Sequence, residues 1–110
     1  MKLPNGRRAI IDQRKISDYC LNLVHEDGSH KARLFQALIG LNRANASLLL
    51  DALRDAAETG DAAVGKADEY GRRYVIDFEL EGPNGTATVR SAWIIRIDEA
   101  VPRLVTCYIR

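Results

Sequence analysis

The chain has 110 residues, of which 46% are apolar and 28% are charged, and its formal net charge is +1. This length supports one domain, residues 1–110, with a single modest core, and leaves no room for a separate catalytic lobe. The near-neutral charge does not imply a bulk electrostatic attraction to nucleic acid, so any basic site has to come from local clustering of cations.

The N-terminal segment, MKLPNGRRAII, contains no apolar run of signal-peptide length, and no later stretch approaches the ~20 apolar residues of a membrane span. We therefore expect a soluble protein of the cytoplasm, with no membrane partner. Cys20 and Cys107 are the only cysteines, and each lies within an apolar pattern. Two buried free thiols are expected, because a disulfide is disfavoured in the reducing cytoplasm.

The first predicted helix follows Asp12 or Ser17, either of which can cap it. Its apolar positions fall at helical spacing and should face the core: Ile16, Tyr19, Cys20 and Leu23. The loop VHEDGS, residues 24–29, ends this helix. His25 and His30 flank the two acidic residues of the loop, but their spacing matches no established zinc pattern, so we expect neither a metal nor another cofactor.

The second predicted helix extends from about His30 to Ile39, with Ser29 as its N-cap and Gly40 as its end. Its apolar stripe consists of Leu34, Phe35, Leu38 and Ile39. Lys31 falls at the centre of this stripe, where a leucine would be expected.

Three cations therefore stand in the first turn of one helix: His30, Lys31 and Arg33. They oppose the helix dipole, an effect typically worth ~0.3–1 kcal/mol for each charge. A bound anion would resolve the conflict, because amides at a helix N-terminus favour phosphate and neighbouring basic side chains strengthen such a site. In the alternative interpretation, Lys31 extends past the rim of the core while His30 and Arg33 are simply solvated.

The third predicted helix extends from about Asn45 to Glu58 and ends near Gly60, which suits a left-handed cap. The side chains that it should bury are Leu49, Leu50, Leu53 and Ala57.

From residue 64 onward the apolar residues alternate, which indicates strands. Residues 72–97 form two long strands joined by the turn GPNG, and PRLVTCYIR forms another after a loop. If the turn is tight, 82 pairs with 85 and paired residue numbers sum to 167. One face of the hairpin is then apolar, contains Trp93 as a packing residue, and should be covered by the helices. This order predicts an α+β domain in which N-terminal helices pack on one face of a C-terminal antiparallel sheet of three to four strands.

The reverse face of the sheet should be polar. The register places Asp77 opposite Arg90, and Arg73 lies on the same face. In the last strand Val105, Cys107 and Ile109 are expected to join the core, which sends Thr106 and Tyr108 to the reverse face beside Arg90. The simplest interpretation is a cross-strand ion pair next to ordinary β-forming residues, and the functional one is that hydroxyls and guanidiniums converge on a phosphate.

Several segments together resemble a family of small bacterial proteins known as domain of unknown function 6883: KLPN, DYCLN, GSHKARLF, ALIGL, DEYGRRYVIDFEL, GPNGTATVRSAWIIR and PRLVTCYI. Members of this family occur as stand-alone small proteins and as C-terminal modules of polymorphic toxins. The resemblance therefore implies a toxin or toxin-antitoxin setting, with a small antitoxin or immunity protein from a neighbouring gene as the partner.

The layout is also similar to metal-independent ribonuclease toxins of the barnase, RelE and colicin kind, in which one face of the sheet meets RNA. Such enzymes need a base for the ribose 2′-hydroxyl, cations for the phosphorane charge and an acid for the leaving oxygen. By this analogy His30 is the general base or acid, Lys31 and Arg90 stabilise phosphate charge, and Thr106 or Tyr108 positions the phosphate. The candidate substrate-binding residues are Arg33, Arg73 and Asp77.

Two functions thus remain open. The first is a metal-independent ribonuclease toxin whose substrate is RNA. The second is a non-catalytic binding module that acts through its sheet edge or as a homodimer, which the near-neutral charge favours.

Overall fold

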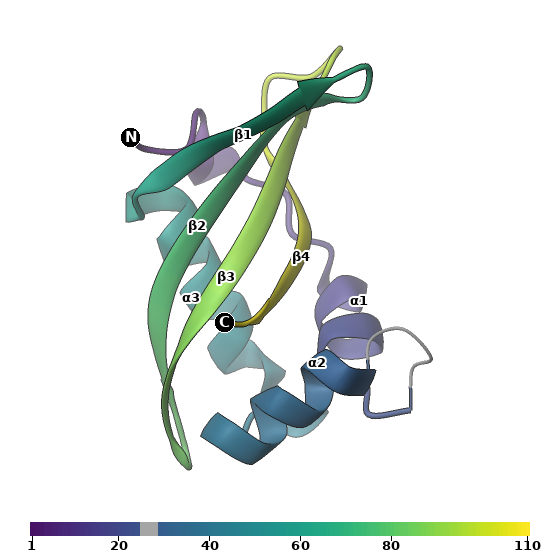
Figure 1. The fold of residues 1–110 in the computed structure, drawn as a ribbon, viewed down its shortest axis with the longest axis vertical. Coiled ribbons are helices and arrows are strands. Elements are labelled where there is room, and N and C mark those ends of the chain that lie inside the picture. Colours follow the sequence, from purple (N-terminus) through teal and green to yellow (C-terminus); the bar gives the residue numbers. More distant parts are fainter. Residues whose placement is uncertain (25–28) are drawn as a thin grey trace.

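A computed structural model describes residues 1–24 and 29–110 and confirms the predicted α+β class (Figure 1). Three N-terminal helical regions pack against a four-stranded antiparallel sheet of order β1-β2-β3-β4. The strands are β1 (Ala62–Asp68), β2 (Gly71–Gly82), β3 (Gly85–Arg96) and β4 (Arg103–Ile109). No helix of the described residues is long and apolar enough to cross a membrane.

The first helical region is short and changes its winding. It begins as α1 (Gln13–Lys15) and continues as a π-helical segment, Ile16–Cys20. Asp12 caps it as predicted, since its carboxylate accepts a 3.0 Å hydrogen bond from the backbone N–H of Arg14. The prediction for Leu23 is wrong, because the helix ends at Cys20 and the wide turn buries Leu21 instead, leaving Leu23 40% exposed.

The second helical region also passes from α2 (Ser29–Leu34) into a π-helical segment, Phe35–Ile39. Ser29 was predicted as the N-cap and is the first helical residue. The wider turn moves Leu38 out of the apolar stripe, so this residue is 50% exposed and its predicted burial is wrong. Gly40 ends the region with φ 73°, a left-handed conformation that suits glycine.

The third helix, α3 (Ala46–Thr59), buries Leu49, Leu53 and Ala57 as predicted and lies behind the β2–β3 hairpin (Figure 1). Leu50 is only partly buried at the edge of the core. The left-handed cap predicted at Gly60 is wrong, because this residue is extended with φ −71°. A Cβ there would lie 2.6 Å from the carbonyl oxygen of Ala56, so glycine is needed for close packing.

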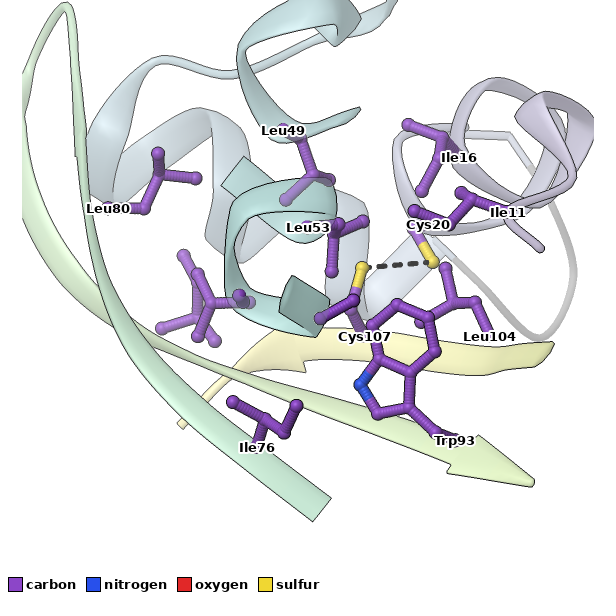
Figure 2. Packing of buried hydrophobic residues seen from close by; sticks show 14 of the residues in the cluster. Ile11, Ile16, Cys20, Leu49, Leu53, Ile76, Leu80, Trp93, Leu104 and Cys107 are labelled. Atoms are coloured by element: carbon purple, nitrogen blue, oxygen red, sulfur yellow. Dashed lines mark hydrogen bonds between the residues drawn. The ribbon is translucent and has the colours of Figure 1, made fainter. Parts of the chain in front are cut away.

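The register of the long hairpin is the predicted one, with Tyr74 opposite Trp93, Asp77 opposite Arg90 and Gly82 opposite Gly85. Its apolar face packs on the helices, and Trp93 is fully buried as a packing residue (Figure 2). The indole Nε1–H of Trp93 donates to Ser91 Oγ, whose hydroxyl donates to the carbonyl oxygen of Ile76.

A bulge in β4 corrects one detail of the predicted core. Ala92 pairs with Thr106 but Trp93 pairs with Leu104, so Val105 is the extra residue between them. Leu104 is therefore the buried residue, at 2% exposed, and Val105 is only partly buried. Downstream of the bulge, Cys107 and Ile109 are buried as predicted.

Cys20 and Cys107 are free and fully buried, as predicted. They come from the π-helical segment after α1 and from β4, and their sulfur atoms face each other in the core (Figure 2).

Candidate functional site

The ammonium group of Lys31 is the point at which three elements meet. From the first turn of α2, Lys31 Nζ donates 3.2 Å hydrogen bonds to Tyr19 Oη and to Thr106 Oγ1. The same nitrogen lies 4.8 Å from the ring centroid of Tyr19 and 5.5 Å from that of Tyr108. Aromatic faces and hydroxyl oxygens both attract a cation, so they hold the ammonium group in place.

Among the described residues, no carboxylate neutralises the positive charge of Lys31. Within residues 1–24 and 29–110, no Asp or Glu oxygen lies within 4.0 Å of its ammonium group. Half-buried charges are usually paired, because removing a charge from water is costly. In the described part of the chain the hydrogen-bond acceptors of Lys31 are neutral hydroxyls, so these contacts leave its charge available to an incoming anion.

Lys31 opens into a cleft of about 630 Å³. Its lining residues are Asp12, Arg14, Lys15, Asp18, Tyr19, Lys31, Val105 and Thr106. Tyr19 is predicted from the sequence only as an apolar position of the first helix, and its place in the cleft was not foreseen. A tyrosine among core positions carries a hydroxyl that packing does not require, and this is the signal that could have identified it.

A second cleft of about 270 Å³ continues the first. Three residues line both clefts: Asp12, Lys15 and Val105. The second cleft also contains Arg96 and Arg103, so the two together form one groove along β4, which we call the β4 groove. Arg103 is paired bidentately with Glu99 at 2.8 Å for both bonds, whereas Lys15 and Arg96 form no ion pair with the described residues.

Arg90 lies next to this site on β3, opposite Tyr108. Its guanidinium donates to both oxygens of Asp77, at 2.8 and 2.9 Å, and Arg110 donates to the same carboxylate at 2.8 Å. The hydrogen bond from Arg90 is the main reason that the pKa of Asp77 lies below its ordinary value. The predicted cross-strand pair is therefore present, and one edge of the Arg90 guanidinium is committed to Asp77.

The structure brings together only part of the predicted site. Lys31, Thr106 and Tyr108 converge, and Arg90 adjoins them through Tyr108. His30 and Arg33 are exposed on α2 and line neither cleft of the β4 groove.

Arg73 lies apart from this cluster. It occupies β2 opposite Ile94, four residues along the strand from Asp77, and pairs with Asp68 at 3.5 Å. His25, one of the two histidines weighed as metal ligands, lies outside the described residues. Within the described part of the chain no three His, Cys, Asp or Glu side chains are grouped to hold a metal ion.

Fold and site together define an α+β domain with a cationic cleft at the edge strand of an antiparallel sheet. The chain belongs to the family described as Domain of unknown function (DUF6883), whose family model matches residues 2–110. No curated protein matches the chain.

Among solved structures, the fold is similar to a chain of the "Contact-dependent growth inhibition toxin - immunity protein complex from Klebsiella pneumoniae 342". The TM-score is 0.66, the identity is 15%, and the match covers 92% of this chain and 99% of that one. At this identity the comparison shows a shared fold over nearly the whole domain.

Proposed function

We propose that the protein is a metal-independent ribonuclease toxin that binds an RNA phosphodiester in the cleft around Lys31. The observation that carries the proposal is the half-buried ammonium group of Lys31, which is surrounded by hydroxyls and aromatic rings and opens to a cleft. Such a fixed cation stabilises negative charge that develops on a phosphate, and it does so without reorganising during the reaction.

In this proposal the ribose 2′-oxygen attacks phosphorus and the bond to the 5′-oxygen breaks, which leaves a 2′,3′-cyclic phosphate and a 5′-hydroxyl. Lys31 stabilises the non-bridging oxygens, and the hydroxyls of Thr106 and Tyr19 position the phosphate. Arg90 adds charge beside Tyr108, while Asp77 orients Arg90.

Proton transfer is assigned to His30, because histidine is the side chain that most often acts as a general acid or base. This residue is exposed beside Lys31 and does not line the cleft, so the scissile phosphodiester would lie at the cleft mouth, where its 2′-hydroxyl or 5′-oxygen comes within reach of the imidazole. Arg33 and Arg73 would contact flanking phosphates from outside it. Lys15 and Arg96, which also form no ion pair with described residues, would extend RNA binding along the β4 groove.

The shared fold supports the toxin setting, since the matching structure is that of a growth-inhibition toxin with its immunity protein. The proposed partner of this chain is accordingly a small immunity protein or antitoxin. The simplest way for it to block activity is to cover the cleft around Lys31 with acidic side chains.

The test is regulated expression in a bacterial host without a partner gene, with growth and total RNA followed in parallel, for the wild type and Lys31→Met. Lys66→Met is the matched control, because Lys66 is exposed on β1, at the sheet edge opposite β4. We expect the wild type and the control to arrest growth and fragment RNA. Lys31→Met should cleave at least about 100-fold more slowly, which is typical for loss of one charge-stabilising group.

The purified protein then distinguishes the chemistry. Cleavage should persist in EDTA, yield 5′-hydroxyl ends, and stop when the ribose at the cleaved position is replaced by 2′-deoxyribose. Intact RNA and normal growth with the wild type, or equal activity of Lys31→Met and the control, would overturn the proposal.

The second candidate function is a non-catalytic binding module, and one surface feature favours it. Tyr70 and Ile97 are 64% and 66% exposed, and the N–H of Ile97 donates to the carbonyl oxygen of Tyr70, so two large apolar residues adjoin at one end of the sheet. If this surface is the functional one, the wild type is harmless to the host. It should also sediment as a dimer that Ile97→Asp converts to a monomer.

A further inference from the structure

The two cysteines form a pair that the proposed ribonuclease chemistry does not use. Cys20 Sγ and Cys107 Sγ lie 3.7 Å apart, although 87 residues separate them in the sequence (Figure 2). A disulfide bond is about 2.05 Å long, so the sulfur atoms need to approach by only roughly 1.7 Å. Both residues are fully buried, so neither thiol contacts solvent.

The surroundings make the two thiols unequal. The S–H of Cys107 donates to Cys20, and this hydrogen bond is the main cause that lowers the pKa of Cys20, with smaller contributions from Thr106 and from the charge of Lys31. The same interaction, together with burial, raises the pKa of Cys107. Since the thiolate is the reactive form, Cys20 is the sulfur that reacts first and Cys107 is the one that resolves.

Cys20 lies directly beneath the cleft. Its sulfur is 4.0 Å from Thr106 Oγ1, and Thr106 lines the cleft together with Tyr19, the residue that precedes Cys20. One layer of side chains therefore separates the sulfur from the cleft, which suits a small neutral oxidant better than a bulky one.

We propose that Cys20 and Cys107 are an oxidisable pair, which a hydroperoxide converts into a disulfide linking the segment after α1 to β4. In the first step the Cys20 thiolate attacks one peroxide oxygen. The O–O bond breaks, an S–O bond forms, and the departing oxygen takes a proton and leaves as an alcohol, or as water when the oxidant is hydrogen peroxide.

In the second step the thiol of Cys107 attacks the sulfenic acid of Cys20, so that the S–S bond forms, the S–O bond breaks and water leaves. Two thiols thus lose two electrons and two protons, and the hydroperoxide is reduced. The disulfide joins the two walls of the cleft, because Tyr19 precedes one cysteine and Thr106 precedes the other. Any effect of this disulfide on RNA cleavage rests on the proposed ribonuclease function. The oxidation of the two cysteines does not depend on that function.

The test treats the reduced, folded wild type with hydrogen peroxide in the absence of denaturant. Trypsin should then release residues 16–31 linked to residues 104–110, because Lys15, Lys31 and Arg103 bound these peptides. We expect both thiols to disappear, dithiothreitol to restore them, and the oxidised protein to melt at least about 5 °C higher, since the bond closes a long loop.

Single variants assign the order of the steps. In Cys107→Ser the sulfenic acid of Cys20 has no resolving thiol and should persist as one added oxygen on the peptide of residues 16–31, whereas Cys20→Ser should not react. If either serine variant fails to fold, the peptide map of the wild type still decides the question. Retention of both thiols, addition of oxygen without the 20–107 link, or a link that forms only in urea would overturn the proposal.

Discussion

Replacing Ser91 with alanine tests the hydrogen-bonded centre of the core. Ser91 is fully buried, accepts the indole N–H of Trp93 at 2.9 Å and donates to the carbonyl oxygen of Ile76 at 2.8 Å. Alanine leaves the indole N–H without an acceptor, and an unsatisfied buried donor costs ~1–3 kcal/mol. We therefore expect Ser91→Ala to lower the free energy of unfolding by about 2 kcal/mol, with a fall in Tm of roughly 10 °C.

A double-mutant cycle with Trp93→Phe separates the lost hydrogen bond from the lost volume. Phenylalanine has no N–H, so Ser91→Ala should cost at least about 1 kcal/mol less in that background than in the wild type. Urea unfolding followed by far-ultraviolet circular dichroism is the appropriate assay, because Trp93 is the only tryptophan and its removal abolishes tryptophan fluorescence. A single-variant cost below about 0.5 kcal/mol, or additive effects, would refute this reasoning.

Two further predictions concern the sheet. Because Arg90 and Arg110 depress the pKa of Asp77 in the folded state, the stabilisation by this carboxylate should be complete above its unfolded pKa and lost as pH falls through the folded value. The urea midpoint of the wild type minus that of Asp77→Asn should thus be constant above about pH 5 and shrink below about pH 4, and a difference that stays constant down to acid pH would contradict the assignment. Gly71→Ala should destabilise the fold by about 3 kcal/mol or more. The reason is that Gly71 has φ 145° and that a Cβ would lie 2.2 Å from the carbonyl oxygen of Ile95. An unchanged thermal midpoint would contradict this prediction, because it would show that the backbone at the start of β2 accommodates the added methyl group.

The register of the β2–β3 hairpin was predictable because alternation and a short turn leave little freedom. A slip by one residue would expose Ile76 and Trp93, so the hydrophobic pattern and the turn GPNG specify the same pairing. The wrong predictions of burial fall where the backbone departs from a regular helix or strand period. The bulge at Val105 and the π-helical segments Ile16–Cys20 and Phe35–Ile39 shift which residues are buried. Apolar spacing cannot reveal an inserted residue or a widened turn.

The candidate site divides in the same way. The sequence identified Lys31 as a cation in an apolar stripe, and it placed Thr106 and Tyr108 on one strand face with Arg90, because local periodicity decides such placements.

Other features follow from contacts between distant segments. Lys31 contacts Tyr19 and Thr106 across sequence separations of 12 and 75 residues, and Cys20 meets Cys107 across 87. The exclusion of His30 from the cleft is equally a matter of how α2 is rotated on β4. By itself the sequence determined the fold class, the hairpin register and the unusual position of Lys31 in an apolar stripe, since each is encoded in residues close together in the chain. Only the tertiary structure decided which groups surround that lysine, because packing brings together side chains whose separation in sequence carries no periodic signal.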